Sequence, residues 1–133
     1  MGFMVQEPNL PAYGKLSCMR ARIDYTDDGT PFAMTPVPAG TELVGMSVKV
    51  TEAFNDGTTD ELTIGNATTA DKYGKVADVT MPTPGTYSTF SGDNAMPFQV
   101  AAAETILLAY TGGTGDSTTG IAYVTVWFAP MAA

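Results

Sequence analysis

Residues that could carry out chemistry are few in this sequence, and histidine is absent from all 133 positions. Without imidazole, Ser-His and Cys-His nucleophile pairs and histidine metal ligands are excluded. Cys18 is the only cysteine, so no disulfide can form within one chain. Arg20 and Arg22 are near enough in sequence to lower a thiol pKa, but we favour a small, buried, apolar cysteine. No thiol enzyme is therefore predicted.

Carboxylates form two close groups, Asp56 with Asp60 and Glu61, and the pair Asp27 and Asp28. Converging carboxylate oxygens can bind calcium or hydrolyse glycosides. Neither spacing matches a calcium-binding loop, and Asp beside Gly is common in turns for conformational reasons. We therefore predict no metal site, no cofactor, no catalytic residues and no enzymatic activity.

The charge balance restricts the class of partner. The chain has 14 acidic and 6 basic residues, a formal net charge of −8. Such a chain repels phosphate backbones, because nucleic-acid affinity comes mainly from Lys and Arg displacing counterions. The sequence shows no basic-then-apolar signal segment and no apolar run near the roughly 18 residues of a membrane helix. We expect neither a nucleic acid nor a membrane as partner, and synthesis in the cytoplasm.

Three segments alternate apolar and polar residues, which is typical of half-buried strands. Helices should be scarce, because the strands are separated by Gly, Pro and Asn turns and no stretch suits a long crossover helix. The positions expected to face the core are Val44, Met46, Val48 and Val50 in 42–51, then Ile106, Leu108 and Tyr110 in 104–111, and Ala122, Val124, Val126 and Phe128 in 121–128.

Turn residues suggest how these strands connect. The Asn-Asp-Gly turn at 55–57, followed by alternation through Leu62 and Ile64, predicts a hairpin with the strand at 42–51. The strands at 104–111 and 121–128 are expected to be neighbours in a closing hairpin.

Shorter elements are predicted between these strands. Residues 75–81 alternate like a strand, and 69–74 allow at most one helical turn. The polar stretch 85–97 predicts a long exposed loop with a short edge strand around Tyr87.

The predicted fold class is all-β, an antiparallel β-sandwich or jelly roll with an extended N-terminal arm. We assign residues 1–33 to the arm, with one strand near 19–25, and residues 34–133 to the sandwich. The arm has apolar residues without a period. It packs over its own sandwich as an outer strand, docks onto a neighbouring subunit or is disordered, and the sequence leaves these alternatives open.

Aromatic and apolar residues outside the core pattern are candidates for a partner interface. Tyr123 and Trp127 lie on the face of the last strand opposite Val124 and Val126, so something must cover that face. A segment of the same chain, a subunit interface and a sugar-stacking platform are the alternatives. The full set of candidate contact residues is Phe3, Met4, Val5, Leu10, Tyr13, Tyr87, Phe90, Tyr123 and Trp127.

Three stretches together resemble a known class of proteins. They are PVPAGTELVGMSVKVTEAF at 36–54, DELTIGNA at 60–67 and AYVTVWFAP at 122–130. With the irregular arm, they resemble the small β-sandwich or jelly-roll structural proteins of tailed bacteriophages, especially capsid cement or decoration proteins. The resemblance covers about residues 36–129.

The resemblance implies a non-enzymatic virion protein on the outer capsid surface, made in the host cytoplasm. Its partner would be the major capsid protein, whose subunits it would bridge by adhesion, and a homo-oligomer, dimer or trimer, would be natural. The alternative is a phage head-fibre, tail or receptor-binding module that recognises a glycan.

Overall fold

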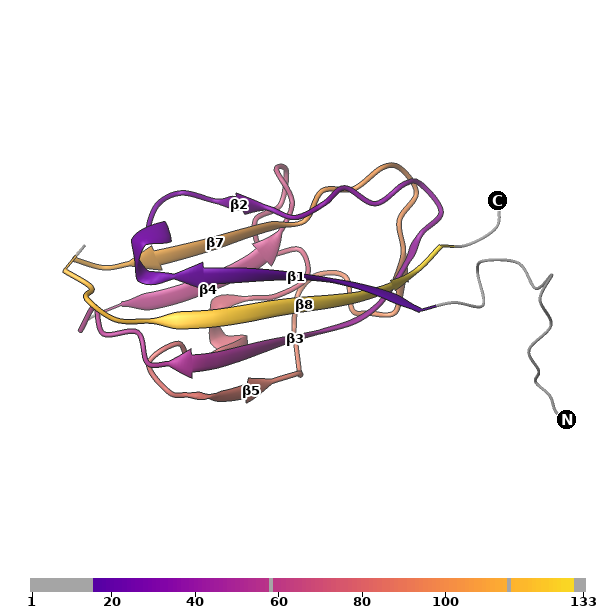
Figure 1. Ribbon diagram of the computed structural model, residues 1–133. Coiled ribbons are helices and arrows are strands. Elements are labelled where there is room, and N and C mark those ends of the chain that lie inside the picture. The colour runs from indigo at the N-terminus through magenta and orange to yellow at the C-terminus, as the bar shows by residue number, and fades with distance from the viewer. Residues whose placement is uncertain (1–15, 58, 115, 131–133) are drawn as a thin grey trace, which may run out of the picture.

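The computed structural model describes residues 16–57, 59–114 and 116–130, which form two antiparallel sheets packed as a β-sandwich (Figure 1). This confirms the predicted fold class. The larger sheet has the order β1-β8-β3-β5, with β6 also pairing with β3, and the smaller has the order β2-β7-β4. The strands are β1 (Ser17–Asp24), β2 (Phe32–Ala33), β3 (Glu42–Glu52), β4 (Asp60–Gly65), β5 (Gly85–Tyr87), β6 (Phe98–Gln99), β7 (Leu107–Gly112) and β8 (Ile121–Ala129).

The hydrophobic core lies between the two sheets, because successive side chains of a strand point to opposite faces. From the larger sheet, β8 contributes Ala122, Val124 and Val126, which are fully buried as predicted. From the smaller sheet, Leu108 and Tyr110 of β7 meet them, and Ile106 just before β7 is also buried as predicted. The Tyr110 ring packs on Phe54 with centroids 4.7 Å apart.

A β-bulge in β3 changes which residues of that strand face the core. The register with β8 shifts between Leu43 and Gly45, so that Leu43 is fully buried while Val44 is 37% exposed. The prediction that Val44 faces inward is therefore wrong, because an extra residue in one strand reverses the alternation before it. Met46, Val48 and Val50, beyond the bulge, are buried as predicted.

Both predicted hairpins are wrong. β3 pairs with β8, β5 and β6, whereas β4 pairs with β7 in the other sheet. β7 and β8 likewise belong to different sheets. Each connection crosses from one layer of the sandwich to the other. The alternation of apolar residues predicts which face of a strand is buried. It does not predict which sheet the strand joins, because both sheets bury one face against the same core.

The segment 75–81 forms no strand, which corrects the prediction made from its alternation. It contains the 3-10 helix η3 (Val76–Asp78), and the Lys75 amide donates to the Asp78 carboxylate over 2.8 Å. The stretch 69–74, for which the sequence allows at most one helical turn, forms no helix and contains a turn in which the Lys72 amide donates to the Thr69 carbonyl at 3.3 Å. The short edge strand expected near Tyr87 is present as β5.

Residues 17–33, within the range assigned to the arm, contribute a strand to each sheet. β1 pairs along its whole length with β8, from Ser17 opposite Phe128 to Asp24 opposite Ile121. The 3-10 helix η2 (Tyr25–Asp27) follows, and β2 then pairs with β7. The chain therefore enters the larger sheet at an edge and passes over to the smaller one (Figure 1).

Candidate interaction surface

The structure describes four of the nine predicted contact residues, and it places them in two separate locations. Tyr123 and Trp127 lie on β8, on the outward face of the larger sheet. Tyr87 ends β5 and Phe90 follows it, at the far edge of the same sheet. The other five predicted contacts lie outside the described residues: Phe3, Met4, Val5, Leu10 and Tyr13.

Trp127 and Tyr123 are half-buried on the outward face, and their cross-strand neighbours differ. Trp127 lies between Cys18 on β1 and Gly45 on β3. A Cβ placed on Gly45 would meet no atom within 4 Å, so the surface beside the indole is open. Around Trp127, the outward face therefore has room for a partner.

Three cations surround Tyr123. In the strand register Arg22 of β1 lies on one side of this tyrosine and Lys49 of β3 on the other. Arg20, two residues from Arg22 on the same face, places its guanidinium carbon 4.5 Å from the centroid of the Tyr123 ring. At this distance the cation is attracted to the ring quadrupole. We call Arg20, Arg22, Lys49, Tyr123 and Trp127 the basic face.

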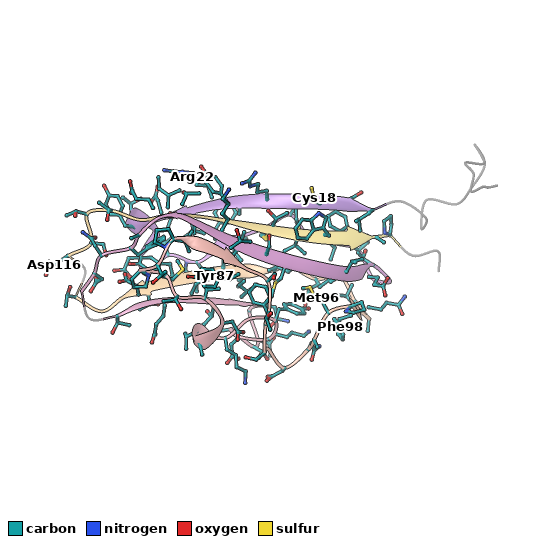
Figure 2. The ribbon with its side chains drawn as sticks, turned by 90° about the horizontal axis from the view of Figure 1, so that it is seen from below. Cys18, Arg22, Tyr87, Met96, Phe98 and Asp116 are labelled. Carbon is teal, nitrogen blue, oxygen red and sulfur yellow. The ribbon has the colours of Figure 1, made fainter. Side chains whose placement is uncertain are left out.

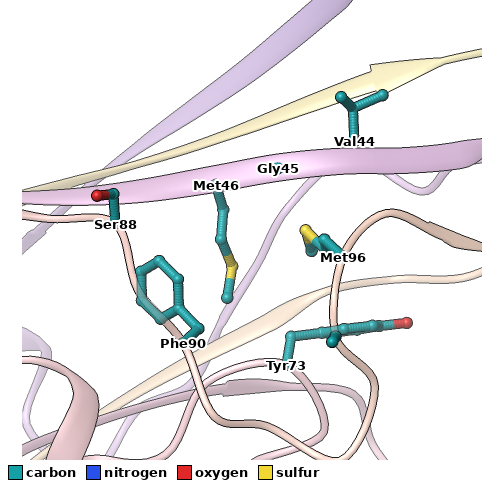
Figure 3. A pocket seen from close by; sticks show the side chains of 8 residues that line it. Val44, Gly45, Met46, Tyr73, Ser88, Phe90 and Met96 are labelled. Carbon is teal, nitrogen blue, oxygen red and sulfur yellow. The ribbon is translucent and has the colours of Figure 1, made fainter.

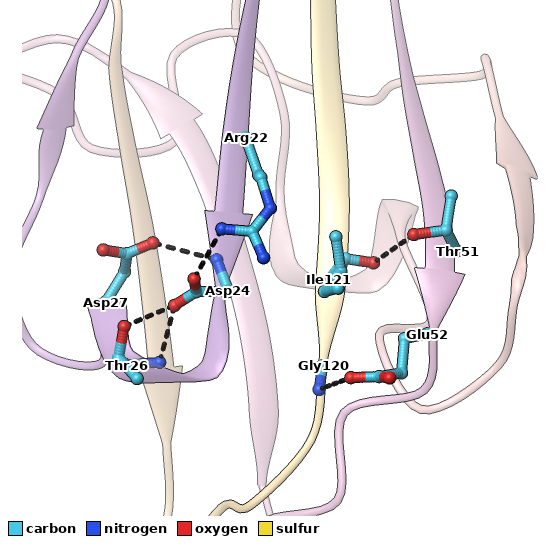
Figure 4. A network of polar contacts seen from close by, with 8 residues as sticks. All are labelled: Arg22, Asp24, Thr26, Asp27, Thr51, Glu52, Gly120 and Ile121. Atoms are coloured by element: carbon cyan, nitrogen blue, oxygen red, sulfur yellow. Dashed lines mark hydrogen bonds and ion pairs between the residues drawn. The ribbon is translucent and has the colours of Figure 1, made fainter.

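The carboxylates at the end of the basic face are hydrogen bonded to backbone amides (Figure 4). Asp24 accepts from the Thr26 amide at 2.9 Å and from the Arg22 guanidinium at 2.8 Å. Glu52 accepts from the Gly120 amide at 2.9 Å. The hydrogen bonds from the Thr26 hydroxyl and amide, together with the smaller effect of Arg22, lower the pKa of Asp24 in spite of its partial burial. Arg22 is thus partly neutralised, whereas no carboxylate of the described residues forms an ion pair with Arg20 or Lys49.

Tyr87 is anchored by its hydroxyl group. The phenol donates to the carbonyl oxygens of Thr80 at 3.0 Å and of Thr83 at 2.6 Å. Its ring packs against the hydrophobic core. Tyr87 therefore holds the loop 80–83 against β5, which is a structural role.

Phe90 lines a cavity of about 250 Å³ beneath β3 (Figure 3). Met46 and Met96 point into the same space, and Val44 points away from it. β5 pairs with residues 48–50 and β6 with residues 42–43, so residues 44–47 have no neighbouring strand on that edge within the described chain. The cavity thus opens at a gap in the sheet edge.

Cys18 is exposed, which makes the prediction of a buried cysteine wrong. β1 is an edge strand whose inward positions are Met19, Ala21 and Ile23, so Cys18 falls on the outward side. Figure 2 shows Cys18 and Arg22 along β1, away from Met96. The thiol lies beside Trp127 in the strand register.

The two groups of carboxylates singled out in the sequence accept hydrogen bonds from other residues of the same chain. Asp56 accepts from the Thr114 amide at 2.6 Å and its hydroxyl at 2.8 Å, and Asp60 accepts from the Tyr110 hydroxyl at 2.5 Å. Asp28 accepts from the Gly112 amide at 3.0 Å. Within the described chain no three His, Cys, Asp or Glu side chains are grouped so that they could hold a metal ion.

Glu104 is the centre of a second polar cluster, which sequence patterns did not indicate. Its carboxylate accepts hydrogen bonds from Asn66 at 3.1 Å, from Lys72 at 3.1 Å and from the Tyr73 hydroxyl. Burial alone would raise the pKa of Glu104, but these three donors outweigh burial and hold it below the ordinary value of 4.5. Burial and the bond to Glu104 raise the pKa of Tyr73. The cluster joins segments from distant parts of the chain.

The cations of the basic face were also missed, although the sequence contains their signal. In 19–24, Met19, Ala21 and Ile23 alternate with Arg20 and Arg22, which places both arginines on one outward face. Lys49 occupies the same outward position in β3. The missing information was that β8 lies between these two strands and brings the three cations around Tyr123.

Comparison with known proteins relates this chain to others by fold. No family model and no curated protein matches its sequence. Among solved structures, a chain of the cyanophage Pam1 capsid asymmetric unit is similar with a TM-score of 0.66 at 14% identity, over 97% of this chain and 94% of that one.

A second solved structure gives the same result. A chain from the acidic stable capsid structure of Helicobacter pylori bacteriophage KHP30 is similar with a TM-score of 0.65 at 12% identity, over 86% of each chain. No helix within the described part of this chain is long and apolar enough to cross a membrane. At such identities the likeness establishes the fold: this chain has the same β-sandwich as chains found in two phage capsids.

Proposed function

We propose that this chain is a structural protein of a phage virion, and more specifically a cement protein that decorates the outer capsid surface. The observation that supports this most is the likeness to a chain of the Pam1 capsid over 97% of this chain and 94% of that one. The proposed role is adhesion to the capsid without catalysis.

The proposed contact with the major capsid protein uses the outward face of the larger sheet. Tyr123 and Trp127 are half-buried in the single chain, so a partner can remove further aromatic surface from water. Interfaces typically bury aromatic residues and arginine at their centre. Contacts made by the copies of a homo-oligomer would add up, because binding of one copy raises the effective concentration of the others at the shell.

The test is cosedimentation of the purified protein with phage heads that lack it, together with a mass measurement of the free protein. Saturable binding at a fixed ratio to the capsid subunits is the expected result. A stable dimer or trimer in solution would support the proposed homo-oligomer. Absence of binding to heads at any protein concentration would overturn the cement role.

The N-terminal residues are proposed to strengthen this contact in trans. β1 begins at Ser17, so removing residues 1–15 leaves every described strand intact. The truncated chain should keep its unfolding midpoint and lose occupancy on heads. Equal occupancy of the truncated and full-length chains would remove Phe3, Met4, Val5, Leu10 and Tyr13 from the interface.

One observation favours a second candidate, a glycan-binding module of a head fibre or tail. The open surface beside Trp127 over Gly45 suits the stacking of a sugar ring on the indole. Binding to a glycan array that disappears in Trp127→Ala, without unfolding and without binding to heads, would favour this candidate.

A further inference from the structure

We infer that the basic face docks onto an acidic protein surface, whose carboxylates approach the three cations around Tyr123. The inference deepens the proposed function by naming the chemistry of the partner, and it rests on that function for placing the partner in a capsid. The observation behind the inference is the arrangement of charge over the described residues.

The cations of this chain are concentrated on one side. Three of its six basic residues, Arg20, Arg22 and Lys49, lie on the outward face of the larger sheet. Lys72 and Lys75, the other two within the described chain, form ion pairs with Glu104 at 3.1 Å and with Asp93 at 3.5 Å. A molecule with a net charge of −8 thus gathers half of its cations on one sheet face.

The positive charge on this face is only partly balanced from within. Asp24 pairs with Arg22 and also accepts from a backbone amide, and Glu52 is hydrogen bonded to Gly120. Arg20 lies over the ring of Tyr123, which attracts a cation without neutralising it. Neighbouring cations repel each other, so an incoming carboxylate relieves this repulsion and gains its own attraction.

The aromatic residues make the face suitable for docking. Tyr123 and Trp127 are half-buried and occupy the middle strand of the face, with the cations on the strands to either side. A partner that covers the rings also excludes water around the cations, which strengthens their attraction to carboxylates. Arginine forms planar, paired hydrogen bonds with a carboxylate, which adds geometric specificity.

A compact acidic protein surface fits this face better than a nucleic acid does. The positive region is bounded by Asp24 and Glu52 at one end, and the rest of the chain is acidic. A long polyanion would extend beyond the three cations and meet these carboxylates. A cluster of a few Asp or Glu side chains on a protein would not.

Trp127 is a fluorescent reporter of binding to the basic face, since it is the only tryptophan in the chain and lies on this face. We would titrate the full chain with a short poly-L-glutamate peptide, which carries only a few carboxylates and does not extend beyond the basic face, and follow tryptophan fluorescence. The expected result is a saturable change in fluorescence at about 50 mM salt. The affinity derived from it should fall at least about tenfold at about 500 mM salt, because salt screens exposed charges.

Two lysine substitutions form a matched pair. Lys49→Glu and Lys75→Glu change the net charge equally, but Lys49 lies on the basic face and Lys75 does not. We expect Lys49→Glu to weaken binding of poly-L-glutamate at least about tenfold and Lys75→Glu to change it less than about twofold. Equal weakening by both variants, or no fluorescence change in the unmodified chain, would overturn the inference. Tighter binding of a single-stranded DNA oligonucleotide than of poly-L-glutamate would overturn it as well.

The same pair tested on phage heads separates this inference from the proposed function. If the unmodified chain binds heads and Lys49→Glu binds equally well, the cement role stands and the acidic partner is wrong. If the unmodified chain binds poly-L-glutamate through the basic face but no heads, the cement role fails and the preference for acidic surfaces stands.

Discussion

The two sheets of the sandwich are alike on their inward faces and different on their outward ones. Inside, both present aliphatic side chains and share one core. Outside, the larger sheet has Arg20, Lys49 and two aromatic residues, whereas β4 and β7 of the smaller sheet present Glu61, Leu107, small residues and no cation.

This difference separates the residues that stabilise the fold from those proposed to bind a partner. A sandwich requires only that each strand bury one face, so its two outward faces are free to differ in chemistry. Substitutions on the inward faces should therefore change the free energy of unfolding. Substitutions on the outward faces should mainly change binding, and only on the larger sheet.

The largest effect is expected from the shared interior. Leu62 of β4 is 1% exposed and packs in the core, so Leu62→Ala removes buried methyl groups and leaves a cavity. We expect a loss of about 2–5 kcal/mol in the free energy of unfolding, measured by urea denaturation. Its neighbour Thr63 lies on the outward side, and Thr63→Ala should cost under about 1 kcal/mol. Similar losses for the two variants would contradict the separation of inward and outward faces.

The next effect concerns the Glu104 cluster and depends on pH. The pKa of Glu104 is below 4.5 in the folded chain, so its contribution is present above the unfolded pKa and is lost as the pH falls through the folded one. Glu104→Gln removes the charge that Asn66, Lys72 and Tyr73 hydrogen bond to, and should cost about 1–3 kcal/mol at neutral pH.

The difference between Glu104→Gln and the unmodified chain should shrink as the pH falls below about 4.5. Asp24 and Asp78 also have lowered pKa values and add acid sensitivity of the same sign to both proteins, so only the difference is informative. A constant difference from neutral to acidic pH would show that the Glu104 charge contributes nothing.

Sequence patterns predicted the layers of this fold better than their connections. Alternation identified the inward residues of β7 and β8, because burial repeats every second residue in a regular strand. It failed at Val44, where a bulge interrupts the repeat, and at 75–81, where an apparent alternation forms η3. Strand partners were wrong because apolar alternation is equally satisfied in either sheet.

The candidate surface could be predicted only in part. Trp127 and Tyr123 stood out because β8 is apolar on both faces. Their cationic neighbours could not be found without the strand order, since Arg20 and Lys49 come from strands that are far apart in sequence. The prediction for Cys18 was wrong because it relied on the usual burial of cysteine. Here Cys18 occupies an outward position of an edge strand and is exposed.

A smaller effect is expected at Cys18, which is a reporter for the outward face of the larger sheet. The exposed thiol lies beside Trp127, so a partner on this face must cover both. We expect a disulfide-exchange reagent to modify the free protein readily, and to react about tenfold more slowly when heads or poly-L-glutamate cover the thiol. Cys18→Ser provides the blank and should bind normally. An unchanged rate in a saturated complex would place the partner elsewhere.

The smallest effect is expected from adding a cation to the other sheet. Glu61 is exposed on the outward side of β4, and Glu61→Lys raises the net charge by as much as Lys49→Glu lowers it. If net charge governed the binding of acidic partners, Glu61→Lys would strengthen it as much as Lys49→Glu weakens it. If the basic face governs it, Glu61→Lys should change poly-L-glutamate affinity less than about twofold and stability by under about 0.5 kcal/mol. Titration and urea denaturation of this variant therefore distinguish local from overall charge, because the added lysine has no neighbouring cation or exposed aromatic ring on its own sheet face.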